Sequence, residues 1–221
     1  MCPQSEGRVR LSENSDWWSG LQSIDSDESI KTQEREVAHT NFKVLGVKLN
    51  DKILENATAK FGKGTFVERG DAALGREQLC FVSAKGTRKT YLIFERGEVH
   101  FSFYLFTGGK KWTGEEYCAK SDAISELVTT GSGLRLGIGP QEVMRILGRP
   151  SLHTKNQLLY SLHVQKKNDK SELAEVGKYH PELSAEDLRR DYEFYDWSAG
   201  IDCKFENSKL TFLAVSMSGT Y

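Results

Sequence analysis

The chain has no long apolar run and almost no net charge. Its 221 residues include 30 Lys and Arg against 31 Asp and Glu, which gives a formal net charge of −1. Its longest apolar runs, such as residues 91–94 and 103–106, are far shorter than the roughly 20 residues that a membrane helix requires. A balanced charge produces no field that attracts nucleic acid or an anionic membrane surface. The composition therefore predicts a soluble protein with no transmembrane segment and no nucleic-acid partner.

Cysteine and histidine are sparse, and their spacing is not that of a metal site. The four cysteines, Cys2, Cys80, Cys118 and Cys203, form no C-x-x-C pair, and the five histidines form no H-E-x-x-H or H-x-H pattern. We expect no metal and no cofactor. The cysteines are either buried free thiols or include one bridge, for which Cys80 and Cys118 are the predicted pair, because they flank the same predicted run of strands. A bridge would place the protein outside the cytoplasm.

Motifs of catalysis are missing as well. The glycines at positions 70 and 75 have the spacing of a phosphate loop, but Arg76 and Glu77 replace the Lys and Ser or Thr that such a loop needs. Ser132 lies directly between two glycines, whereas a nucleophile elbow has its glycines two residues away on each side. The sequence therefore predicts a protein that is not an enzyme, and an enzyme of unknown class is only the third interpretation.

The N-terminal region differs in character from the rest of the chain. Residues 1–36 are mainly polar and charged, and they contain no apolar run followed by a cleavage site for secretion. We predict a polar N-terminal arm over residues 1–36, anchored by Trp17 and Trp18, since two indoles bury a large area.

The region 37–110 is predicted to be a first helix-and-sheet repeat. Asn50 is a suitable N-cap, apolar residues then follow at helical spacing to Phe61, and Gly62 stands where a helix would stop. Three strand-like runs follow, at 79–83, 90–95 and 98–106, with glycines in the reversals between them. In the last run the alternate residues 99, 101, 103 and 105 are expected to face the helix.

The region 134–221 is predicted to repeat this plan after a connecting segment at 111–133, which is expected to contain a helix around 119–128. Pro140 suits the first turn of a helix, and glycine and proline at 148 and 150 would end it. Strands are predicted at 158–164, 192–197, 201–206 and 209–217. A charged insertion, 165–190, carries Ser184 as the start of one short helix and is a candidate for a functional lip.

Two stretches carry a resemblance to known proteins. The residues LGIGPQEV (136–143), followed by ILGRP (146–150), resemble a signature of the outer-membrane assembly lipoprotein family and of the tandem halves of the β-lactamase inhibitor protein. The first half is similar at LGVKLNDKI (45–53) and FGK (61–63) but lacks the proline. The resemblance implies an α+β fold of two tandem helix-plus-antiparallel-sheet units. It implies no catalytic residue.

The leading functional interpretation is a non-catalytic exported protein-binding module in the periplasm or cell envelope, in its sharper form an inhibitor or immunity-type protein. Aromatic residues on the sheet faces away from the helices are the predicted partner-binding residues: Tyr104, Phe106, Tyr195 and Trp197. The alternative is a structural cell-envelope lipoprotein, in which Cys2 would be lipidated and form a lipid anchor. A cytoplasmic location is the alternative to the envelope, and the partner's identity is open.

Overall fold

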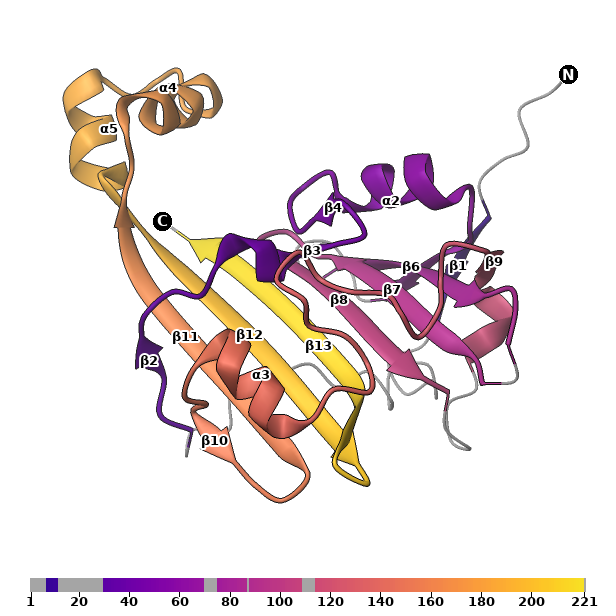
Figure 1. Cartoon of the computed structure of the whole chain (residues 1–221). Helices are drawn as coiled ribbons and strands as arrows, with labels where there is room; N and C mark the ends of the chain where they lie inside the picture. The colour runs from indigo at the N-terminus through magenta and orange to yellow at the C-terminus, as the bar shows by residue number, and fades with distance from the viewer. Residues whose placement is uncertain (1–6, 12–29, 70–74, 87, 109–113, 221) are drawn as a thin grey trace, which may run out of the picture.

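A computed structural model describes residues 7–11, 30–69, 75–86, 88–108 and 114–220. In this part of the chain eleven strands form one mixed sheet (Figure 1). Its main order is β1 (Arg8–Arg10), β5 (Phe66–Arg69), β6 (Arg76–Ser83), β7 (Thr90–Arg96), β8 (His100–Thr107), β13 (Lys209–Thr220), β12 (Phe194–Glu206), β11 (Gln157–Lys167) and β10 (Leu152–His153). Strand β2 (Gln33–Glu34) pairs with β11, and β9 (Ala119–Ser121) pairs with β6. A separate hairpin joins β3 (Lys43–Val44) to β4 (Val47–Lys48).

The sheet is continuous from one half of the chain to the other, so the prediction of two small helix-plus-antiparallel-sheet units is wrong. The last strands of the two halves, β8 and β13, pair antiparallel from Phe106 opposite Phe212 to His100 opposite Ser218. An unpaired strand edge exposes a row of N–H and C=O groups, and pairing the two edges satisfies both rows. The result is a single large sheet rather than two.

Two helices cover one face of this sheet, α2 (Ile53–Phe61) over the first half and α3 (Pro140–Leu147) over the second (Figure 1). Pro140 occupies the first turn of α3 as predicted. The N-cap of α2 is Lys52 and not the predicted Asn50, which accepts a hydrogen bond from the Lys52 backbone N–H at 3.1 Å in the turn before the helix. Gly62 and Gly148 end the helices with φ angles of 95° and 79°, which glycine adopts without strain.

The main hydrophobic core lies between the helices and the sheet and extends across both halves. Ile53 and Leu54 of α2 are fully buried in it, and so is Val143 of α3. In β8, Phe103 and Leu105 face this core as predicted, and Phe101 packs against its edge. The alternation of strand side chains therefore predicted the helix-facing side of β8 correctly, but Val99, which was predicted to share it, precedes β8 and is exposed.

A second, smaller core lies on the opposite face of the sheet, over β5–β8. It contains Tyr91, Ile93, Tyr104 and Phe106, all of which are buried. The disulfide between Cys80 and Cys118 lies beside it, with a Cα–Cα distance of 4.5 Å. This is the pairing predicted from the sequence.

The connecting segment differs from its prediction. No helix covers 119–128; instead a 3₁₀ turn (Gly114–Tyr117, η3) leads into β9, which pairs in parallel with β6. The disulfide at Cys118 holds the start of this strand against β6. The bridge and the added strand thus replace the predicted helix.

The strands of the second half are longer than predicted. The two strands predicted at 192–197 and 201–206 are one, β12, which runs unbroken through Gly200. Asn207 and Ser208 form the reversal to β13. Their φ angles of 50° and 59° are positive, as in the type I′ turns that are common in hairpins.

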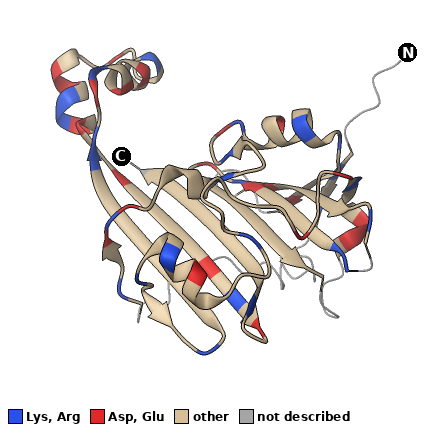
Figure 2. Cartoon of the chain, viewed as in Figure 1, with Lys and Arg blue, Asp and Glu red and all other residues tan. Residues whose placement is uncertain are grey.

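The charged insertion forms a helical hairpin that extends beyond the ends of β11 and β12 (Figure 1). It consists of α4 (Lys170–Tyr179) and α5 (Ala185–Tyr192), two helices where one was predicted. Ser184 accepts a hydrogen bond from the N–H of Asp187 at 3.1 Å and begins α5 as predicted. Both basic and acidic residues lie on this hairpin (Figure 2), so its charge does not indicate a class of partner.

The two apolar residues at the end of α3 are expected to contribute differently to the free energy of unfolding. Leu147 is 2% exposed, whereas Ile146 is partly exposed and packs at the edge of the core. Leu147→Ala should lower the free energy of unfolding by about 2–5 kcal/mol, and Ile146→Ala by about 1 kcal/mol. Denaturant melts of both variants measure the difference. Equal losses would contradict the orientation of α3 described above.

Candidate functional site

Most of the predicted partner-binding aromatics are buried, so that prediction is corrected. Tyr104 and Phe106 are 2% and 5% exposed within the second core, and Trp197 is 3% exposed in the main core. Only Tyr195 is partly exposed, and it packs against the main core. Tyr104 and Trp197 lie on opposite faces of the sheet, so the four residues cannot form one patch.

A polar part of the sheet lies on the face opposite α3, turned away from the viewer in Figure 1. Two adjacent rows of small polar residues cross β11, β12, β13 and β8 there. The first row is His163, Ser198, Ser218 and His100, and the second is Ser161, Gly200, Ser216 and Ser102. We call these eight positions the trough. A histidine stands at each end of the first row, and no apolar side chain belongs to either row.

The trough is the floor of a pocket of about 690 Å³, which all of its positions except Ser102 line. Ile30 and Thr32 form one wall, and the Thr32 and Ser161 hydroxyl oxygens are 2.9 Å apart. The hollow arises because small side chains stand where the neighbouring rows carry larger ones, such as Leu159 and Tyr104. A bound molecule would therefore meet hydroxyl and imidazole groups on the floor, together with hydrocarbon from side chains such as Ile30 and Leu159 around it.

The two ends of the trough are held differently. At one end Asp196 Oδ1 is 3.6 Å from His163 Nε2, and Glu34 is the register partner of His163 in β2. At the other end His100 Nε2 is 2.7 Å from the Ser102 hydroxyl and 4.0 Å from Glu95 Oε1. The first end is therefore exposed and acidic, and the second is tied to the protein interior.

Glu95 anchors the interior end and is 1% exposed. Its carboxylate accepts hydrogen bonds from Gln78, from Arg76 at 3.3 Å and from the Tyr104 hydroxyl at 3.3 Å. Burial, with the nearby Glu95 charge, raises the pKa of Tyr104 well above its usual value, so the phenol stays protonated and donates. A buried carboxylate with this many donors serves as a structural support for His100.

Ser198, His163 and Asp196 have the connectivity of a serine-hydrolase triad, and the geometry argues against that chemistry. The Ser198 hydroxyl is 3.2 Å from His163 Nδ1, but the Asp196 oxygen at 3.6 Å lies beyond hydrogen-bonding range. The side chains of His163 and Asp196 are 40% and 50% exposed, so water competes for both. Strand β12 is paired on both sides at Ser198, which leaves its backbone N–H unavailable for an oxyanion hole.

Other reactive groups in the described residues do not assemble either. Cys203 is fully buried, and burial raises the pKa of its thiol, so it is not a reactive thiolate. No three His, Cys, Asp or Glu side chains gather as metal ligands in the described ranges. No helix in those ranges is long and apolar enough to cross a membrane. Cys2, Trp17 and Trp18 lie outside the described residues, so the predicted lipidation and anchoring stay predictions.

Reasoning from the sequence missed the trough, although its signal is present. The patterns His-x-Ser at 100–102, Ser-x-His at 161–163, Ser-x-Gly at 198–200 and Ser-x-Ser at 216–218 alternate with apolar residues. Each pattern alone indicates only the wet side of a strand. Comparisons of the chain with protein-family models, with curated proteins and with solved structures found no match. The geometry of the trough therefore carries the functional argument.

Proposed function

We propose that this chain is a non-catalytic, exported protein-binding module whose trough receives a loop of a protein partner. The observation that carries the proposal is the pocket of about 690 Å³ over two rows of small polar residues in the middle of a rigid sheet. Binding sites are concave and largely pre-formed, and a floor without bulky side chains leaves room for side chains of the partner.

The chemistry of the trough favours a polar loop with a basic residue. Serine hydroxyls both donate and accept hydrogen bonds, so they suit polar side chains and main-chain groups of a loop. Asp196 at the His163 end favours a Lys or Arg of the partner there, because opposite charges at a rim steer association and fix orientation. The strands beneath are paired on both sides, so recognition would come from side chains and not from strand addition.

The disulfide supports export. Bridges such as that between Cys80 and Cys118 persist in oxidising compartments and are rare in the cytoplasm. This favours the periplasm or the cell envelope as the location. An inhibitor or immunity-type role is the narrower form of the same proposal, in which the partner is an enzyme whose loop the trough blocks.

Filling the trough is expected to weaken partner binding without unfolding the protein. A photo-crosslinking residue at Ser218, between Ser198 and His100 in the first row, should capture a specific partner, and the same residue at Lys60 on α2 should not. With that partner purified, Ser218→Trp should weaken binding at least tenfold in calorimetry, about 1.4 kcal/mol, because the indole occupies the space of the loop.

Lys60→Trp is the matched control, since it adds the same side chain on the opposite face and should leave the affinity unchanged. Asp196→Lys tests the predicted basic anchor and should weaken binding as well. If Ser218→Trp binds the purified partner as tightly as the native chain does, the trough is not the partner site.

A further inference from the structure

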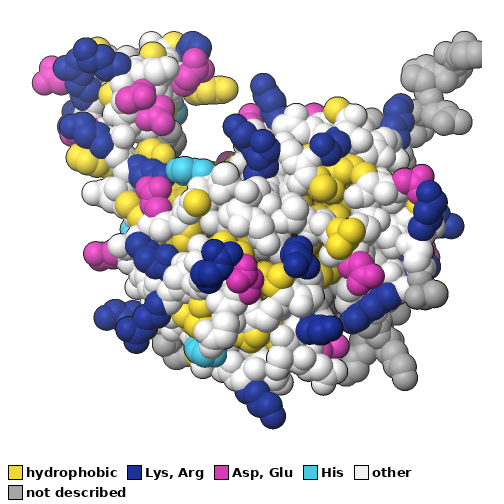
Figure 3. Space-filling model, in the orientation of Figure 1, with side chains coloured by type: hydrophobic (Ala, Val, Ile, Leu, Met, Phe, Trp, Pro, Cys, Tyr) yellow, Lys and Arg dark blue, Asp and Glu magenta, His cyan; other side chains and the backbone are white. Residues whose placement is uncertain are grey.

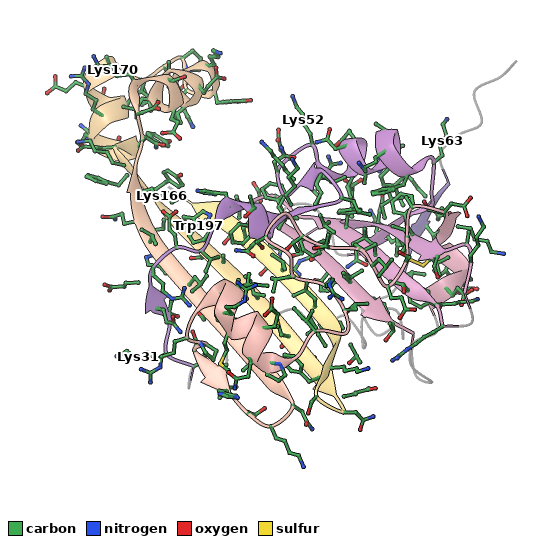
Figure 4. All side chains as sticks on the ribbon, in the orientation of Figure 1. Lys31, Lys52, Lys63, Lys166, Lys170 and Trp197 are labelled. Atoms are coloured by element: carbon green, nitrogen blue, oxygen red, sulfur yellow. A yellow bond between two sulfur atoms is a disulfide. The ribbon has the colours of Figure 1, made fainter. Side chains whose placement is uncertain are left out.

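A second groove lies at the edge of the sheet, around the loop that connects α3 to β10. One pocket of about 700 Å³ is lined by Arg145, Arg149 and His153, and a neighbouring pocket of about 550 Å³ is lined by Lys31 and Arg149. Both pockets share residues 149–151, so they adjoin one another at Arg149. We call the two together the basic groove. Figure 4 shows Lys31 at the outer edge of the molecule, beside β2.

The backbone of the basic groove is fixed by hydrogen bonds from neighbouring elements. The Arg149 carbonyl accepts from Arg35 Nη2 at 2.8 Å and from Gln33 Nε2 at 3.2 Å. The Gly148 carbonyl accepts from the Tyr160 hydroxyl at 3.1 Å. These carbonyls lie at the negative end of α3, where they would repel an anion, and the donors offset that repulsion. The position of Arg149 is thus set before any ligand arrives.

The cations of the groove are only partly balanced by acids. Within the described residues the Arg149 side chain is exposed and makes no hydrogen bond or ion pair of its own. Arg145 is different, since Glu142 accepts from it at 2.6 and 3.0 Å. Glu34 is the acidic residue among the described lining of the two pockets. Figure 3 shows Lys and Arg side chains around the lower left of this face, with few Asp and Glu among them.

We propose that the basic groove binds a phosphate group. The Arg149 guanidinium would donate two parallel hydrogen bonds to phosphate oxygens, and Lys31, which lines the smaller pocket with it, would supply a second positive charge. The guanidinium of Arg149 and the ammonium of Lys31 together match a phosphate, which offers several acceptor oxygens and up to two negative charges. The same group occurs in a free phosphate and in a phospholipid headgroup, and the groove fits the chemistry that these share.

The test uses two probes and a charge-matched control. Inorganic phosphate is titrated into the protein and followed by NMR, and binding to vesicles of phosphatidylglycerol is compared with binding to vesicles of phosphatidylcholine. Arg149→Ala should weaken phosphate-dependent binding about tenfold or more, and Arg149→Lys should retain part of it. Lys209→Ala removes the same charge from the exposed end of β13, away from the groove, and should change nothing.

The outcomes separate the ligand sources and the two proposals. Binding of inorganic phosphate alone identifies a small ligand, and binding only to phosphatidylglycerol identifies a lipid headgroup; both support the groove if they depend on Arg149. No binding to either probe, or equal losses in Arg149→Ala and Lys209→Ala, overturns the proposal. Ser218→Trp should leave phosphate binding intact, so failure of the trough as a partner site does not affect this result.

Discussion

Replacing Trp197 with alanine is expected to lower the free energy of unfolding by about 3–5 kcal/mol. The indole is 3% exposed, meets the Phe42 ring edge-on at a centroid distance of 5.5 Å, and lies under Lys166 Nζ at 4.9 Å. Figure 4 shows Lys166 and Trp197 close together near the upper end of β11 and β12. Truncation would leave a cavity and remove both contacts. Urea denaturation followed by circular dichroism measures the loss.

Tyr195→Ala provides the comparison, because Tyr195 precedes Trp197 by two residues in the same strand and is partly exposed. Its loss should be about 1 kcal/mol. A Trp197→Ala variant that melts like the native protein would mean that the indole is at the surface, as the sequence had suggested.

Reduction of the disulfide is expected to cost about 4 kcal/mol of stability. Cys80 and Cys118 are 38 residues apart in sequence, and closing a loop of that length restricts the unfolded chain by roughly this amount in the chain-entropy model. Denaturant melts with and without a reductant should differ accordingly. The double variant Cys80→Ala/Cys118→Ala should be insensitive to the reductant, which separates the bridge from other effects. An unchanged midpoint on verified reduction would contradict the prediction.

Local features were predictable because short-range physics decides them. Pro140 and Gly148 mark the two ends of α3, Ser184 begins α5, and Asn207 and Ser208 turn the chain between β12 and β13. The helix-facing side of β8 followed from simple alternation. Each of these features depends on fewer than about ten consecutive residues, so the sequence of that short stretch is enough to predict it.

The pairing of β8 with β13 could not be predicted in this way. Two edge strands with matching alternation are equally consistent with separate sheets, and only their mutual pairing decides between one sheet and two. The same uncertainty explains why the predicted partner-binding aromatics were expected to be exposed. Tyr104 alternates like a solvent-facing residue, but it lies in a second core beside the disulfide. Which face of a sheet is covered depends on segments distant in sequence.

The trough was beyond sequence reasoning for a related reason. His163 and His100 lie at opposite ends of one row only because four strands from both halves align in register. A one-residue slip in any of these pairings would turn the serines toward the core. The candidate site is therefore a property of the assembled sheet and not of any single segment.

The pairing of β8 with β13 also affects how the chain folds. Residues at one end of this ladder, such as Phe106 and Phe212, are more than one hundred residues apart in the sequence, so the pairing closes a long loop. Domains dominated by such distant contacts fold slowly, and until β13 emerges from the ribosome β8 is an apolar, unpaired edge. We expect a fragment that ends at residue 110 to aggregate, and the nascent chain to depend on chaperones that shield this edge until its partner strand arrives.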